Sequence, residues 1–321
     1  MVQEDAQPHR IGTNQRPASW HTLRFGLAGL WILDGLLQLQ PGMFTMDMIS
    51  TIMQPVANGE PPWLHHLIAW SILLVTPHLV TFNWTVVAIQ ILIGLLLLAP
   101  WPNVLKSGLW LSIVWSALVW LFGEGLGQLL TGSATFITGA PGSVFFYGVA
   151  AGLLLWSRGW RGRWPLAARL ATQVVALSLL LAAALQLVPI FWTSLGLATS
   201  IGSAATMAQP AWMRAPIDWS ALWASRLPVV VNALIILACL SLGVLVMAAP
   251  HSRWVVFAAI CWLVVVWWIG QDLGALTSGM ATDPNSAPVL ALLLITGWRA
   301  RRDATLVVAL HPERAAEVAG S

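Results

Sequence analysis

Long apolar runs separated by short polar or glycine-rich segments make up most of this chain. With its flanks, each run is long enough to cross about 30 Å of hydrocarbon as an α-helix. The pattern predicts an all-α polytopic membrane protein with eight transmembrane helices, at about residues 20–40, 84–100, 107–123, 142–157, 167–189, 229–249, 254–271 and 284–298. Asp283 followed by Pro284 is typical of a helix start, with Asp283 as the N-cap of the last helix.

One further apolar stretch, Trp63–Phe82, is interrupted by His65, His66, Pro77 and His78. With eight spans and a cytoplasmic N-terminus, thirteen of the fifteen basic residues fall on the cytoplasmic side, whereas a ninth span would leave five there. The positive-inside rule therefore favours eight spans. We expect Trp63–Phe82 and its counterpart Asp218–Leu227 to be interfacial or re-entrant outer segments. Both termini are then cytoplasmic, in a bacterial plasma membrane.

The two halves of the chain share sequence motifs. Val119–Thr135 aligns without a gap on Val266–Thr282, with nine of seventeen positions identical, and Leu37–Pro41 is similar to Leu185–Pro189. Such self-similarity predicts a duplicated domain whose two repeats are parallel, because both start on the cytoplasmic side. The resulting organisation is a cytoplasmic N-terminal tail (1–19), a first four-helix repeat (20–157), a basic cytoplasmic linker (158–166), a second four-helix repeat (167–299) and a cytoplasmic C-terminal tail (300–321).

Composition agrees with a membrane location. The chain is 58% hydrophobic and only 8% charged, whereas a soluble domain carries about 25% charged residues. We therefore expect the lipid bilayer as its surrounding. The net charge of +3 follows from the cytoplasmic basic residues and does not indicate nucleic acid as a partner. Cys239 and Cys261 stand alone, so neither a disulfide nor a redox thiol pair is expected.

The opening helix around Leu30–Gln38, with Asp34-Gly35 at its centre, and the four-helix unit resemble the DoxX-like superfamily of small membrane proteins. That superfamily includes the DoxD-type subunit associated with thiosulfate:quinone oxidoreduction. Gly123-Glu124-Gly125 and Gly142-Ser143 are also similar to an uncharacterised family of bacterial, often actinobacterial, integral membrane proteins. The resemblance implies an integral membrane subunit of an extracytoplasmic-facing redox system that contacts quinone and a redox enzyme partner.

Asp34 is a carboxylate in the middle of the first predicted helix, with Gln38 one turn further on the same face. An ionised carboxylate near mid-membrane costs about 2.5–3.5 kcal/mol, so we expect it to face the bundle interior. The second half keeps the amide as Gln186 but has Ala182 at the position of the acid. One interpretation is a pocket specialised in one half, and the other is a hydrogen bond between Asp34 and Gln38 without further function.

Acidic and aromatic residues also lie near the outer ends of the third helices. The acid is Glu124 in one half and Asp272, next to Gln271, in the other. We predict Asp34, Glu124 and Asp272 as proton-carrying residues. Arg226, the outlier among the basic residues, either pairs with Asp272 or Asp218 or holds an anion or a quinone carbonyl. The expected ligand-binding residues are Gln38, Gln186, Gln271, Arg226, Trp120 and Trp267.

Glycines four residues apart end both third helices, at Gly123 and Gly127 and at Gly270 and Gly274. Small residues with this spacing favour close helix packing. The alternative is that the glycines let the backbone unwind and approach a ligand.

Four of the nine methionines lie within eleven residues of the first outer loop. They are Met43, Met46, Met48 and Met53, and the loop continues to His65 and His66. Thioether and imidazole ligands suit Cu(I), which makes this loop a candidate copper site. The alternative is an interfacial helix whose methionines pack against lipid. A transporter of a small solute or copper, and a structural membrane scaffold, thus remain alternative functions.

Overall fold

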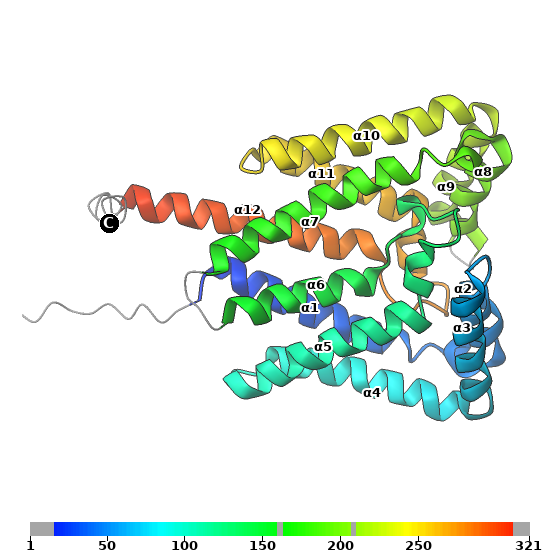
Figure 1. The fold of residues 1–321 in the computed structure, drawn as a ribbon, viewed down its shortest axis with the longest axis horizontal. Helices are drawn as coiled ribbons and strands as arrows, with labels where there is room; N and C mark the ends of the chain where they lie inside the picture. Colours follow the sequence, from blue (N-terminus) through cyan, green and yellow to red (C-terminus); the bar gives the residue numbers. More distant parts are fainter. Residues whose placement is uncertain (1–15, 159–162, 207–209, 311–321) are drawn as a thin grey trace, which may run out of the picture.

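The computed structural model describes residues 16–158, 163–206 and 210–310, and no β-strand occurs among them. Eight helices of the described chain run along the molecule, and other helices gather across one end of it (Figure 1). The eight are α1 (Ala18–Leu37), α4 (Leu79–Leu98), α5 (Pro102–Phe122), α6 (Ser143–Arg158), α7 (Trp164–Leu185), α10 (Pro228–Ala248), α11 (Arg253–Val265) and α12 (Ser286–Leu310). Each predicted helical segment is therefore helical in the structure.

Five stretches of the described chain are long and apolar enough to cross a membrane. They are Pro62–Leu98, Pro102–Phe122, Trp164–Leu185, Pro228–Ala248 and Arg253–Gly270. The predicted class, an all-helical membrane protein, is confirmed at this level. α6 is apolar but shorter, and α1 carries polar residues such as Arg24 and Asp34.

The first of these stretches is bent. Helix α3 (Pro62–Val75) ends in the 3-10 turn η3 (Thr76–His78), where Pro77 has no amide hydrogen to donate and His78 leaves helical geometry with φ −125° and ψ 24°. α3 consequently crosses the end of the bundle, whereas α4 runs along it (Figure 1). α4 begins at Leu79 rather than at residue 84, because the apolar run continues without a break beyond the bend.

Four other short elements accompany α3 at this end of the molecule, which we call the capped end (Figure 1). They are the π-helix η2 (Met48–Met53), α2 (Gln54–Val56), α8 (Ser194–Gly202) and α9 (Ala211–Arg226). The polar segment Asp218–Leu227 forms the later part of α9. Both halves of the chain thus place helical segments across the same end.

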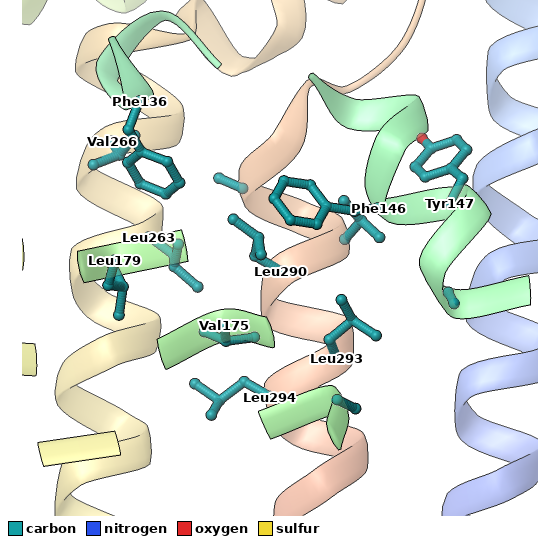
Figure 2. Packing of buried hydrophobic residues seen from close by; sticks show 14 of the residues in the cluster. Phe136, Phe146, Tyr147, Val175, Leu179, Leu263, Val266, Leu290, Leu293 and Leu294 are labelled. Carbon is teal, nitrogen blue, oxygen red and sulfur yellow. The ribbon is translucent and has the colours of Figure 1, made fainter. Parts of the chain in front are cut away.

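A single large apolar cluster joins the two halves. Val175 and Leu179 of α7 and Leu290 and Leu293 of α12 are completely buried in it (Figure 2). α7 contributes many alanines to the cluster, including Ala168, so neighbouring helices approach it closely. The contact between α7 and α12 is therefore made by apolar side chains that pack against one another.

Two buried asparagines close the ends of α1 and α7. Asn83 of α4 donates to the carbonyl oxygen of Gln38 at 2.8 Å, and Asn232 of α10 donates to that of Gln186 at 2.9 Å. Gln38 and Gln186 each directly follow the last residue of their helix. Each amide therefore satisfies a carbonyl that has no partner within the helix.

Replacing Asn83 by leucine is expected to lower the free energy of unfolding by about 1 to 2 kcal/mol, because the Gln38 carbonyl loses its buried donor. Asn232→Leu should have a similar effect at Gln186. Asn103→Ala, at an exposed position of α5, serves as the control. Unfolding by sodium dodecyl sulfate from mild detergent measures all three, and a loss no larger than that of the control would contradict the assigned role.

The start of α12 differs from the prediction. The helix begins at Ser286, and its preceding residue Asn285 has a positive φ of 68°. Asn285 Oδ1 accepts from the amide of Ser286 at 2.7 Å, while Asp283 Oδ1 accepts from the amide of Asn285, also at 2.7 Å. Asp283 as the helix N-cap is therefore wrong, because the left-handed residue between them separates its carboxylate from the helix.

The glycine pairs combine both expected roles: Gly270 packs closely against the backbone of Ile137, whereas the second glycine of each pair lies where the backbone unwinds. Gly127 and Gly274 lie beyond the helices in tight turns, with φ of +67° and +71°. Each turn packs directly against a proline backbone, Pro141 for Gly127 and Pro284 for Gly274. The backbone does unwind at these two turns, but it approaches the loop that leads into the following helix.

Candidate functional site

A cavity of about 330 Å³ lies between α1, α4 and α5 near the capped end. α3 and η2 cover it. Its walls are largely apolar and include four aromatic side chains, those of Trp70, Phe82, Trp115 and Phe122. The polar side chains that line it are Asp34, Gln38, Ser71, Gln90, Glu124, Thr282 and Asp283. An apolar hollow with a few converging polar groups is the usual form of a small-molecule site.

Asp34 lies at the inner part of this cavity and is only 1% exposed. Its Oδ1 accepts a hydrogen bond from Tyr147 Oη of α6 at 3.3 Å. The Tyr147 ring in turn packs edge-on against Trp31, with 5.0 Å between the ring centres. The other carboxylate oxygen, Oδ2, is buried without a hydrogen-bond partner. Tyr147, rather than Gln38, is thus the residue that orients the acid.

Two amides share the cavity with Asp34. Gln38 and Gln90 are 5% and 4% exposed, and the Oε1 atom of each is buried without a partner. A buried acceptor without a donor costs about 1 to 3 kcal/mol. Together with Asp34 Oδ2, these atoms offer three acceptors to any molecule that enters the cavity.

Glu124 lies beyond the end of α5 and caps the start of α6. Its Oε1 accepts from the Ser143 amide at 3.0 Å, from Ser143 Oγ at 2.9 Å and from the Val144 amide at 3.4 Å. Burial and the nearby negative charge of Asp283 raise the pKa of Glu124 from 4.5 to about 8, although these hydrogen bonds act in the opposite direction. The carboxyl group therefore changes its charge within the physiological pH range.

Gln271 has the corresponding position at the start of α12. Its Oε1 accepts from the Ala287 amide at 3.1 Å, and its Nε2 donates to Ser286 Oγ at 3.0 Å. A neutral amide thus does in the second half what a carboxyl group does in the first. Capping alone does not require the acid.

A second cavity of about 220 Å³ lies among the loops at the capped end. It shares Glu124 and Asp283 with the cavity beside Asp34, and Gln128, Thr138 and Asn285 also line it. The two acids therefore lie where the cavity beside Asp34 meets these loops.

The second half keeps the spacing of these positions but has different residues at two of them. Ala182 precedes Gln186 by four residues, as Asp34 precedes Gln38, and Cys239 follows Asn232 by seven, as Gln90 follows Asn83. Both Ala182 and Cys239 are buried. From the second half, only Thr282 and Asp283 line the cavity beside Asp34, as far as the described residues show.

The predicted pocket residues are consequently divided. Asp34, Gln38 and Glu124 lie in one cavity, together with Gln90 and Asp283, which the sequence interpretation missed. The other predicted members do not line it: they are Gln186, Gln271, Asp272, Arg226, Trp120 and Trp267. A polar residue inside the apolar run of α4 and the single tyrosine of the chain were the signals for Gln90 and Tyr147.

The two tryptophans have matching structural roles. Trp120 Nε1 donates to the carbonyl of Pro141, and Trp267 Nε1 to that of Pro284, both at 2.7 Å. Each ring therefore fixes the loop that leads into the following helix.

Arg226 and its expected partners are placed differently from the prediction. Arg226 is exposed at the end of α9, and Asp218 pairs with Arg214 at 3.2 Å. An ion pair between Arg226 and Asp218 is therefore wrong, because Arg214 lies one helical turn before the aspartate on the same face. Asp272 is 2% exposed and has a positive φ of 49° in the turn after α11.

The methionines separate into two environments. Met43, Met48 and Met53 are buried in an apolar cluster with Ile49 and Val75, whereas Met46 is 55% exposed.

The two histidines of the same region are exposed. His65 Nδ1 lies 2.9 Å from the carbonyl oxygen of Ala57. Among the described residues, no group of three or more histidine, cysteine or acidic side chains is arranged to hold a metal ion. The buried methionines have the surroundings of packing residues, and the copper site stays a prediction.

Comparison of the chain with protein-family models, with curated proteins and with solved structures finds no match. The site must therefore be interpreted from its own geometry.

Proposed function

We propose that this chain is an integral membrane subunit whose first half binds a quinone-type ring in the cavity beside Asp34. The observation that carries the proposal is the combination of an apolar lining that includes four aromatic side chains with three unpartnered buried acceptors, on Asp34, Gln38 and Gln90. A hydroquinone hydroxyl donates to such oxygens, while its flat ring packs against Trp115 and Phe122.

Two parallel four-helix repeats with eight spans form the frame in this proposal. Support comes from pairs of equal contacts, namely Asn83 with Asn232 and Trp120 with Trp267, at similar distances in both halves. α1, α6 and α12 run beside the five apolar stretches (Figure 1). α3 and α9 then lie in the outer interface, because they cross the end of the bundle.

The proposed role is that of a membrane component in an extracytoplasmic-facing redox system. Reduction of a quinone takes two electrons and two protons, and oxidation of the hydroquinone returns them. A redox enzyme partner at the outer face exchanges the electrons. Asp34 and Glu124 exchange the protons with the ligand, since both acids line its cavity. Glu124 also lines the second cavity, which lies among the loops.

A second candidate is the transport of a small organic cation. Asp34, Glu124 and Asp283 line the cavity, and no lysine or arginine lines it among the described residues. Acids without a basic counterpart favour a positively charged solute.

The test is the double substitution Asp34→Ala and Gln90→Cys, which places in the first half the residue types that the second half has at Ala182 and Cys239. We expect quenching of tryptophan fluorescence by a decyl-quinol to require at least tenfold more ligand than in the wild type. Asn103→Ala, on an exposed position of α5, is the control and should bind normally. Equal affinity in all three proteins would overturn the quinone proposal. Loss of organic-cation binding alone in the double variant would favour the transporter.

A further inference from the structure

Two large side chains that line the cavity are also exposed. Trp70 of α3 is 56% exposed and Leu118 of α5 is 44% exposed. The acceptors on Asp34, Gln38 and Gln90 are buried. The cavity therefore has a mouth at Trp70 and Leu118 and an interior at the three acceptors.

The mouth lies on the outward face of α5. Trp110, Val114 and Leu118 follow one another at intervals of four residues and are 52%, 53% and 44% exposed. Ser112 and Ser116, on the opposite face, are buried. Since α5 is one of the helices apolar enough to cross a membrane, its exposed apolar stripe is the surface that meets acyl chains. Leu118 belongs both to this stripe and to the cavity wall.

Another part of the lining is acidic. Glu124 and Asp283 belong to it, and both acids also line the second cavity. The exposed wall at Trp70 and Leu118 carries no charged group, and Ser71 is the polar neighbour of Trp70 on α3.

We infer that the ligand of this site is dissolved in the bilayer and enters sideways, through the mouth between α3 and α5, with its apolar tail left at Trp70 and Leu118. The inference rests on the proposed function, because it describes how the same cavity is filled. It narrows the ligand class to an amphiphile with a flat polar head and an alkyl tail. Head-group protons are exchanged with Asp34 and Glu124, which line the same cavity.

The test uses the full chain in nanodiscs and a quinone whose decyl tail ends in a photoreactive diazirine. After irradiation, peptide mass spectrometry should place the label on the α3 and α5 segments around Trp70 and Leu118. Label on the outer-loop segments that contain Gln128 or Asn285 would overturn lateral entry while leaving quinone binding intact. Absence of saturable binding would instead overturn the proposed function.

A substitution at the mouth provides a second readout. Leu118→Trp is expected to slow association of the decyl-quinone at least tenfold, since the larger ring narrows the entrance. Val114→Trp, one turn earlier on the same exposed stripe but outside the cavity lining, is the matched control and should leave the rate unchanged. Equal association rates in the two variants would overturn the inference. Both positions are exposed, so both proteins should fold.

Discussion

Gly127→Ala is expected to lower the free energy of unfolding by about 3 kcal/mol or more. Gly127 has a φ of +67°, which side chains with a β-carbon rarely adopt, and an added β-carbon would collide with the backbone of Pro141. That backbone cannot move away freely, because Trp120 donates to its carbonyl at 2.7 Å. Thermal and detergent unfolding measure the loss.

Gly132 separates the effect of the positive φ from the effect of the contact with Pro141. It has a similar φ of +74°, but no atom lies within 4 Å of an added β-carbon. Gly132→Ala should therefore cost only the conformational strain, about 1 kcal/mol. If both substitutions cost the same, the contact between the turn and Pro141 would contribute nothing.

The free energy of unfolding of the wild type is expected to fall between pH 5 and pH 8, and Glu124→Gln is expected to abolish this fall. The pKa of Glu124 is about 8 in the folded protein, whereas in the unfolded chain the group titrates near 4.5. As the pH rises through this window the unfolded state loses its proton first, so the free energy of unfolding falls. Each unit of difference between the two pKa values contributes about 1.4 kcal/mol, so the expected fall across this window is a few kcal/mol.

The second half supplies the control for this prediction. Gln271 caps α12 with a neutral amide, so glutamine at position 124 should keep the cap of α6. Unfolding curves measured from pH 5 to pH 8 should be flatter for Glu124→Gln than for the wild type, with equal stability at pH 5. Parallel curves across the whole range would show that the titration of Glu124 is not linked to folding.

The helices could be predicted from sequence because apolar runs of spanning length have few other stable solutions in lipid. The exact helix ends and the contacts made in turns could not be predicted from the sequence. The start of α4 at Leu79 depends on how the chain turns at Pro77. Gly127 has the spacing of a packing glycine, but only the path of the following loop shows that it contacts Pro141.

The candidate site was predictable in part. Asp34 and Glu124 stood out because charged residues are rare in this chain, and both line the cavity. Alignment of the halves also suggested Gln186 and Gln271, since it identifies equivalent positions. It does not show whether their surroundings are hollow or filled. Tyr147 was missed because its contact with Asp34 joins positions 113 residues apart.

Because the cavity beside the unpartnered oxygens of Asp34, Gln38 and Gln90 is hollow, its ligands can be found by the rise in melting temperature that they cause. A molecule that fills it completes the inner packing of the first half and supplies the missing donors. By mass action, a ligand present at a hundred times its Kd raises the unfolding free energy by about 2.7 kcal/mol. A library of lipid-soluble rings can therefore be screened by melting temperature alone, with no assay of turnover and no prior choice of substrate.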